Sequence, residues 1–276
     1  MSQPTRESVS RRTFVTTTAA AVAMAAAPKT LVAMARPTAE PLRVGLVGCG
    51  GRGTGAARDC LRSSDDVVLV AMGDLFPDRV QRSLENLRRV ASEDAAFAAK
   101  FKVTPETTFT GFDAYEKVLA AEIDLVILAT PPGFRPGHLA AAVAAGKHVF
   151  MEKPVAVDPA GVRSVIASSE AARARGLAIV AGTQRRHDPS YLATVQRIHD
   201  GTIGRIVGGQ VFWNQGGLWK ADREPSWSDA EWQIRNWLYF TWLSGDHIVE
   251  QHIHNLDVAN WALGGPPVRA NGVGGR

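Results

Sequence analysis

A glycine-rich turn between an apolar run and a helical segment constrains the fold of this chain more than any other feature. Residues 42–47 are followed by Gly48, Gly50 and Gly53 in the spacing G-x-G-x-x-G, and a helical pattern continues through residues 56–61. The first glycine of such a turn allows a tight bend, the second lets the backbone approach a pyrophosphate, and the third lets the helix pack on the strand. N–H groups at the helix start are free to bind phosphate. The segment predicts a dinucleotide site at Gly48, Gly50, Gly51, Arg52 and Gly53.

A second apolar run, residues 67–72, ends at Gly73 and Asp74. An acidic side chain at the end of this strand accepts hydrogen bonds from the adenosine ribose hydroxyls and repels a 2′-phosphate. Asp74 therefore favours NAD over NADP as the cofactor. The alternative interpretation is that Asp74 caps a helix that begins near Pro77.

Alternating helices and strands predict a doubly wound parallel sheet of the Rossmann type, an α/β fold. Further apolar strands are expected at residues 124–129 and 148–151, and helices at residues 77–99, 113–121 and 137–145. These two strands end in a Thr-Pro and a Glu-Lys-Pro sequence, and open parallel sheets bind ligands at this carboxyl edge. We therefore expect cofactor contacts from Thr130, Pro131, His138, Glu152 and Lys153.

These motifs, with residues 146–149 (GKHV) and 184–191 (QRRHDPSY), resemble those of the Gfo/Idh/MocA oxidoreductases, the group of glucose–fructose oxidoreductase and inositol dehydrogenase. The Glu-Lys-Pro sequence is the most specific of them. The resemblance implies an NAD-binding Rossmann domain over residues 36–154. It also implies an α+β substrate domain over residues 155–276, built on a large open-faced sheet that commonly forms homo-oligomers. Because the family's second domain usually runs well beyond this length, we expect that domain to be truncated here.

The strongest signal in the second half is the segment 245–257 (GDHIVEQHIHNLD). At about 100° per residue, His247, Glu250, His254 and Asp257 would share one helical face. The alternatives are a polar face in contact with solvent and a zinc site, but neither an H-E-x-x-H motif nor a cysteine pair supports a metal. We therefore expect no metal.

The resemblance implies roles for these side chains in oxidising an alcohol. His254 would be the base that takes the hydroxyl proton, because its ordinary pKa lies near neutral pH. Lys153 would hydrogen-bond the same oxygen and stabilise its alkoxide character. Glu250 would accept from a neighbouring hydroxyl or tune the pKa values of Lys153 and His254.

Aromatic residues in the second half suggest a carbohydrate pocket. All seven tryptophans lie from Trp213 onward, and five of them fall between residues 218 and 243. Their rings could stack on sugar faces, or they could belong to a core or a subunit interface. We expect substrate contacts from Arg186, Tyr191, Trp219 and Asp257.

The amino-terminus resembles a twin-arginine export signal. Arg11 and Arg12 precede a weakly apolar stretch, and an A-x-A site at residues 33–35 allows cleavage before Arg36. The stretch is too short and too poor in Leu and Ile for a stable membrane anchor. We therefore expect a signal peptide over residues 1–35, the twin-arginine translocase as a partner, and a periplasmic or secreted protein.

The positive charge of the chain is concentrated in this segment. The whole chain has 31 basic and 27 acidic residues, but residues 1–35 hold four basic residues against one acidic residue. The remainder is almost neutral and has no basic stripe, which argues against a nucleic-acid partner.

Together these features predict an exported NAD-dependent oxidoreductase that transfers hydride between nicotinamide and a hydroxyl carbon of a sugar, cyclitol or glycoside. One alternative is a redox-neutral glycosidase or epimerase that retains its NAD between steps. Another is a truncated nucleotide-binding protein without catalysis.

Overall fold

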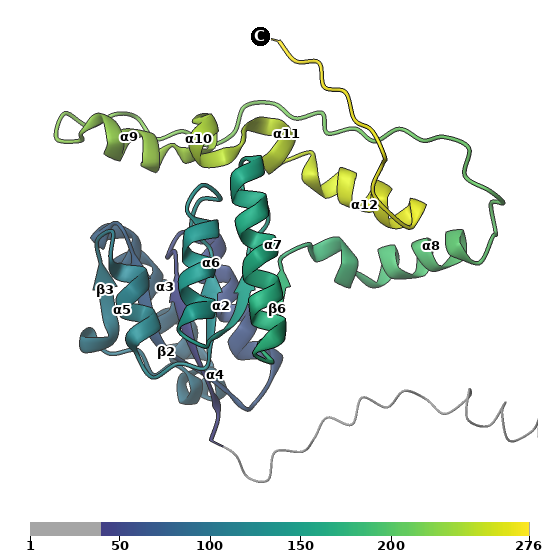
Figure 1. Cartoon of the computed structure of the whole chain (residues 1–276). Helices are drawn as coiled ribbons and strands as arrows, with labels where there is room; N and C mark the ends of the chain where they lie inside the picture. The colour runs from purple at the N-terminus through teal and green to yellow at the C-terminus, as the bar shows by residue number, and fades with distance from the viewer. Residues whose placement is uncertain (1–39, 276) are drawn as a thin grey trace, which may run out of the picture. The chain divides into compact units, whose positions relative to one another are not determined.

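The computed structural model describes residues 40–275. Its six strands form one parallel sheet in the order β3-β2-β1-β4-β5-β6 (Figure 1). The strands are β1 (Leu42–Val47), β2 (Val67–Asp74), β3 (Thr108–Thr110), β4 (Leu125–Leu128), β5 (His148–Met151) and β6 (Ile179–Ala181). Because β1 lies between β2 and β4, the strand order reverses beside the glycine-rich turn, where open α/β sheets bind ligands. The predicted Rossmann fold is confirmed.

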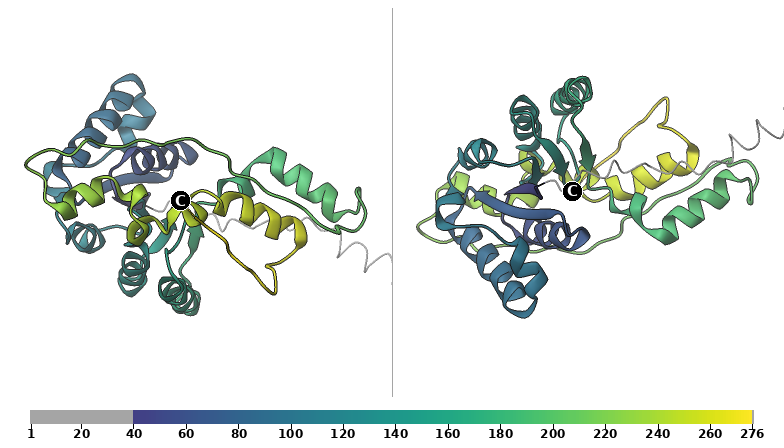
Figure 2. Two further views of the ribbon diagram at one scale, coloured as in Figure 1. Left: turned by 90° about the horizontal axis from the view of Figure 1, so that it is seen from above. Right: turned by 90° about the horizontal axis from the view of Figure 1, so that it is seen from below.

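Helices cover both faces of this sheet, because its strands carry apolar side chains on both sides. Leu46 and Leu69 face one helical layer, whereas Val47 and Val126 face the other. Figure 2 shows the two layers on opposite sides of the strands. The first layer is α2 (Gly51–Ser63), α3 (Pro77–Glu93) and α4 (Ala95–Lys100); the second is α5 (Ala114–Ala120), α6 (Arg135–Ala144) and α7 (Pro159–Ala174).

The helix predicted over residues 77–99 is two helices, which is a correction. Asp94 adopts an extended backbone between α3 and α4, and its carboxylate accepts a hydrogen bond from the Phe97 N–H at 3.0 Å. This side-chain cap satisfies one of the free N–H groups at the start of the new helix.

The boundary predicted after residue 154 is too early. Strand β6 pairs with β5 in parallel, so α7 and β6 extend the Rossmann sheet. The elements that follow are α8 (Pro189–His199), α9 (Asp229–Arg235), α10 (Thr241–Ser244), α11 (Asp246–Glu250) and α12 (Ile253–Leu263). Helices α8 and α12 lie side by side (Figure 2), and α9 to α11 lie across the carboxyl edge of the sheet (Figure 1).

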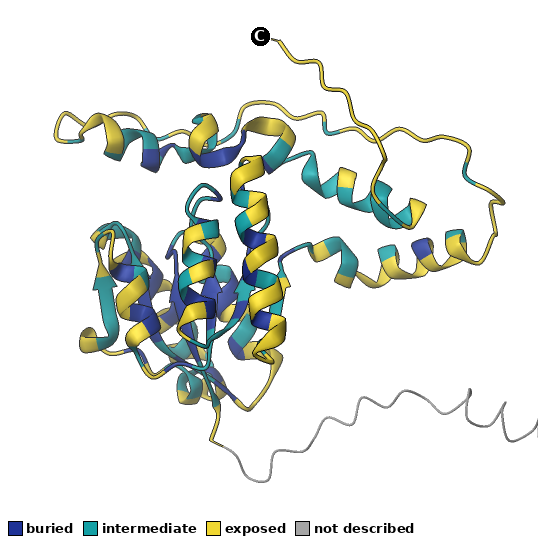
Figure 3. Cartoon of the chain, viewed as in Figure 1, coloured by how far each residue is buried: buried dark blue, intermediate teal, exposed yellow. Residues whose placement is uncertain are grey.

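The expected open-faced sheet is not formed in the described part of the chain, where no strand follows β6. Residues 206–224 run without regular structure and are mostly exposed (Figure 3). A strand is held by hydrogen bonds to a neighbouring strand, and this segment pairs with none among residues 40–275.

The signal peptide predicted for residues 1–35 lies outside the described residues. Within residues 40–275, no helix combines the length and the apolar character needed to cross a membrane.

Candidate active site

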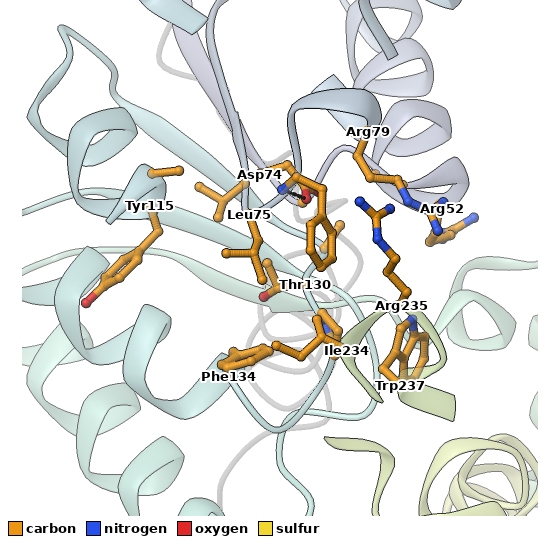
Figure 4. Close-up of a pocket in the computed structure, with 18 of the residues that line it drawn as sticks. Arg52, Asp74, Leu75, Arg79, Tyr115, Thr130, Phe134, Ile234, Arg235 and Trp237 are labelled. Atoms are coloured by element: carbon orange, nitrogen blue, oxygen red, sulfur yellow. Dashed lines mark hydrogen bonds between the residues drawn. The ribbon is translucent and has the colours of Figure 1, made fainter. Parts of the chain in front are cut away.

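A cavity of about 440 Å³ opens beside the glycine-rich turn (Figure 4). It contains most of the residues that the sequence assigns to the cofactor. These are Gly48, Gly50, Gly51, Arg52, Gly53, Asp74, Thr130, Pro131 and His138. Trp219, expected at the substrate, also lines this cavity, whereas Glu152 and Lys153 do not.

The glycines of the turn fit a phosphate-binding cradle. A Cβ on Gly48 would lie 2.6 Å from the Ala129 carbonyl carbon, and a Cβ on Gly53 would lie 1.8 Å from the Gly48 oxygen. Both positions therefore need glycine for packing. A Cβ on Gly50 or Gly51 would meet nothing within 4 Å, so the protein leaves this side of the turn open. Open space at the start of α2 fits a pyrophosphate held by backbone N–H groups.

Asp74 is held at the end of β2 by two backbone groups. Its Oδ2 accepts from the Cys49 N–H at 2.7 Å and its Oδ1 accepts from the Phe76 N–H at 2.9 Å. Burial raises the pKa of the Asp74 carboxyl despite these bonds. Phe76 rather than Asp74 is the N-cap of α3, so the alternative of a helix cap is not what the structure shows. The fixed carboxylate faces the cavity, where each oxygen has a further lone pair for a ribose hydroxyl.

His138 lies in an aromatic corner of the same cavity. Its ring stacks on Tyr115 at 4.3 Å between ring centroids, and its Nδ1 is 3.1 Å from the Thr130 hydroxyl. Burial lowers its pKa to about 4, with a smaller effect from the Arg135 charge. The imidazole is therefore neutral at pH 7 and offers a polar edge within an apolar wall.

Lys153 and Glu250 form a buried pair at the end of β5. The Lys153 ammonium donates to Glu250 Oε1 at 2.8 Å and to the Glu250 carbonyl oxygen at 2.6 Å. Glu250 Oε2 is buried and has no hydrogen-bond partner within residues 40–275. Burial raises the pKa of Glu250, and Lys153 opposes this effect. The pair leaves one ammonium proton and one carboxylate oxygen unused, which is what two hydroxyls of a polyol require.

Two arginines connect this pair to its surroundings. The Arg52 Nε donates to Glu152 Oε1 at 2.6 Å, which joins the glycine-rich turn to the Glu-Lys-Pro segment. Arg135 is buried and donates to the Pro154 carbonyl oxygen. Its charge lies close to Glu152 and Glu250, and burial lowers its pKa to about 10. Arg52 thus lines the cavity and also binds the residue that precedes Lys153 in sequence.

His254 lies in the first turn of α12. Its ring stacks on Trp213 at 5.4 Å, and burial lowers its pKa to about 4. The positive charges of Lys153, Arg185 and Arg52 contribute to this lowering of the pKa, and the Asp257 charge opposes it. This neutral imidazole near Lys153 can accept a proton.

The single helical face predicted for His247, Glu250, His254 and Asp257 is wrong. Helix α11 ends at Glu250 and α12 begins at Ile253, so the regular spacing is interrupted between them. The His247 and His252 rings pack edge to face, with their centroids 4.8 Å apart. Among residues 40–275, no three His, Cys, Asp or Glu side chains are placed to hold one metal ion.

The residues predicted to bind substrate are divided between two places. Arg186 donates to both carboxylate oxygens of Asp257 at 2.8–3.0 Å, and its guanidinium lies 5.2 Å from the Trp261 ring. The Arg185 guanidinium lies over the Tyr191 ring, with its central carbon 5.4 Å from the ring centroid. Trp219 packs on Trp237 at the cofactor cavity instead.

Several residues of the cavity wall were not predicted from the sequence. Arg79 could have been found, because it lies in the first turn of the helix that follows Asp74. Ile234, Arg235 and Trp237 could not, because they lie more than 150 residues along the chain from Asp74 and no motif marks them.

Comparison with known proteins agrees with this geometry. Residues 42–180 match the model of the GFO_IDH_MocA family, described as an oxidoreductase family with an NAD-binding Rossmann fold. The chain is 29% identical over 227 residues to inositol 2-dehydrogenase from Rhizobium meliloti (strain 1021), an alignment that covers 82% of this chain and 56% of that protein. It is 28% identical over 232 residues to the Ralstonia nicotianae inositol 2-dehydrogenase, with 84% and 57% covered.

A solved structure shares the fold. Scyllo-inositol dehydrogenase from Lactobacillus casei with bound NAD(H) and scyllo-inositol superposes with a TM-score of 0.55 at 22% identity, covering 81% of this chain and 56% of that one. The chain thus spans little more than half the length of these relatives.

Proposed function

Because the chain belongs to the Gfo/Idh/MocA oxidoreductase family, we propose that it transfers a hydride between NAD and a hydroxyl-bearing carbon of a cyclitol, sugar or glycoside. The observation that carries the proposal is the Lys153–Glu250 pair beside His254. It supplies a proton donor and a proton acceptor next to the glycine-rich cleft. Inositol 2-dehydrogenases among the relatives support a cyclitol as the first class to test.

The residues that would hold the dinucleotide are those of the cavity. Gly50 and Gly51 leave space for the pyrophosphate, and Asp74 would accept from the adenosine ribose. When bound, NAD supplies the hydride acceptor. Every proton movement then belongs to the side chains of the protein.

His254 would take the proton of the reacting hydroxyl. Its lowered pKa keeps it neutral, so its lone pair is available at pH 7. The third ammonium proton of Lys153 would hydrogen-bond the same oxygen and stabilise its developing negative charge. Glu250 Oε2 would accept from a neighbouring hydroxyl and orient the ring.

The first test asks whether the purified protein retains a bound dinucleotide. The purified chain is denatured, and the released material is identified by absorbance and mass. A panel of inositols, sugars and glycosides is then assayed for NADH formation at 340 nm, with Lys153→Ala as the control. Substrate-dependent NADH that the control fails to produce supports the proposal. Product without net NADH would favour a redox-neutral cycle, and no turnover despite NADH binding would favour a non-catalytic protein.

NAD rather than NADP is proposed as the cofactor because Asp74 holds its carboxylate in the cavity. Replacing Asp74 by Ala should narrow the preference for NADH over NADPH, since the change removes the repulsion of a 2′-phosphate. Fluorescence titration of both cofactors checks this. Tighter binding of NADPH than NADH by the unaltered protein would contradict the assignment of Asp74 to the ribose.

We further propose export by the twin-arginine route into the periplasm or medium. The support is Arg11 and Arg12 before a weakly apolar stretch and an A-x-A site. The translocase would then be a transient partner.

A further inference from the structure

The outer wall of the dinucleotide cavity comes from a distant part of the chain. Asp74, Phe76 and Arg79 line one side, on β2 and the start of α3. Ile234 and Arg235 of α9 line the opposite side, with Trp237 beside them (Figure 4). Trp219 also lines the cavity. The cavity is therefore enclosed between the Rossmann sheet and a segment that lies beyond it in sequence.

Arg235 fastens this segment to α3. Its Nη2 donates to Asp78 Oδ1 at 2.9 Å and its Nη1 donates to Asp78 Oδ2 at 3.2 Å. Two parallel charge-assisted bonds of this kind are stronger and more directional than a single one. The Arg235 side chain is 11% exposed and the Asp78 side chain is 39% exposed, so the pair is shielded from water on the Arg235 side only.

Aromatic rings hold the same guanidinium in place. Its central carbon lies 3.9 Å from the Phe76 ring centroid and 4.6 Å from the Trp227 ring centroid. The Arg235 Nε also donates to Glu231 at 2.9 Å within α9. Arg235 thus joins α9 to the turn between Asp74 and α3 through both charge and stacking.

We propose that α9 covers the adenosine half of the cofactor site. The Arg235–Asp78 ion pair, called the latch below, would set the rate at which NAD(H) enters and leaves. This inference rests on the proposed function, because Asp74 places the adenosine ribose beside Asp78. A dinucleotide under α9 leaves only when the latch opens. The fraction of open molecules therefore limits exchange.

Slow exchange has a consequence for the chemistry. A retained NAD would allow the hydride taken from one substrate to be returned to the same or a second substrate. Such retention suits a protein that works away from a supply of free NAD.

The experiment measures NADH release from the full chain by stopped flow, using NADH fluorescence and excess NAD as the competitor. The latch variants are Arg235→Gln, Asp78→Asn and the double variant. Each single variant should release NADH about tenfold faster, the order expected for loss of one charge-assisted pair. The double variant should release it no faster than the faster single variant, because both changes remove the same interaction.

Two matched controls keep the latch and remove only the second ion pair of each partner. Glu231→Gln breaks the 2.9 Å pair with Arg235 inside α9, and Arg82→Gln breaks the 3.2 Å pair with Asp78 inside α3. Both should release NADH within about twofold of the unaltered rate, because an ion pair between residues four positions apart in one helix contributes little. Circular dichroism verifies that each variant folds. If Arg235→Gln does not fold, the NADH release rate of Asp78→Asn alone tests the latch.

Release from Asp78→Asn and Arg235→Gln at the unaltered rate would overturn the latch while leaving NAD binding intact. Faster release from the control variants as well would also overturn it, since any loosening of the surface would then suffice. Failure of the unaltered chain to bind NADH would instead overturn the proposed function, and the latch with it.

Discussion

Single residues at this site act through buried charges that depend on one another. Lys153 and Glu250 are 13% and 10% exposed at their side chains, and Arg135 lies close to the same carboxylate. Removing one partner of such a pair leaves a buried charge without compensation, at a cost of about 3–5 kcal/mol. Substitutions here therefore need a stability measurement beside every rate.

His254→Ala should reduce hydride transfer by ~10²–10⁴-fold, because the change removes the proposed base. NADH affinity should change little, since His254 does not line the dinucleotide cavity. Single-turnover kinetics and NADH titration measure the two effects. The control is His252→Ala, because the His252 ring packs against His247. If His254→Ala kept near-normal hydride transfer and His252→Ala lost it, the base would be His252 and the assignment to His254 would be wrong.

The pH dependence of kcat/KM should report the lowered pKa of His254. Burial moves this pKa from 6.5 to about 4, so the imidazole stays neutral and competent as the pH falls from 7 to 5. The acid limb should therefore have its midpoint near pH 4. A midpoint near 6.5 would show an imidazole exposed to solvent.

The same profile needs a check of folding. The pKa of His138 is also lowered to about 4, so the unfolded chain binds protons below pH 6.5 that the folded chain does not. The free energy of unfolding must then decrease as the pH falls through this window. Circular dichroism at each pH separates this loss of stability from loss of the base.

At the scale of elements, the β1–α2 turn divides its glycines between packing and binding. Gly53 has no room for a side chain, whereas Gly50 has an ordinary backbone φ of −67° and open space. The turn can therefore be altered in two ways that separate folding from cofactor binding.

Gly53→Ala should lower the free energy of unfolding by about 1–3 kcal/mol or more, because the new Cβ would overlap the Gly48 carbonyl oxygen. Gly50→Ala should leave stability within about 1 kcal/mol and yet weaken NADH binding, because its methyl group occupies the open side of the turn. Urea unfolding and NADH titration test the pair. Equal NADH affinity in Gly50→Ala and the unaltered chain would place the pyrophosphate elsewhere.

At the scale of the whole molecule, the described residues build a complete Rossmann sheet and a set of helices across its carboxyl edge. The Lys153–Glu250 pair, the Arg52–Glu152 pair and the Arg235–Asp78 pair all join residues at least 97 positions apart. The site therefore depends on the fold of the chain from β1 to α12.

Replacing Arg11 and Arg12 together by Lys should leave a folded protein in the cytoplasm of a host that has the twin-arginine route. The paired arginines are the specific part of the proposed signal, and the change preserves their charge. Cell fractionation with immunoblotting measures the location, and Arg6→Lys is the matched control. Continued export of the double variant would contradict the signal.

The sequence alone determined the Rossmann half, because its signals are local. The apolar runs of β1, β2, β4 and β5, and the glycine spacing at residues 48–53, depend on neighbours a few positions away. The end of each strand then located Asp74, Thr130 and Lys153, since parallel strands bring their carboxyl ends to one edge.

Only the tertiary structure decided how the second half meets this edge. Periodicity placed Glu250 and His254 on one continuous helix. In the structure the helix is interrupted between α11 and α12, and the Glu250 carbonyl oxygen accepts a hydrogen bond from Lys153. Trp219 was expected at the substrate and lies in the cofactor cavity, while Arg235 had no signal at all. Pairs such as Arg235–Asp78 form between residues 157 positions apart, and their free energy arises from burial and stacking that exist only after the chain has folded.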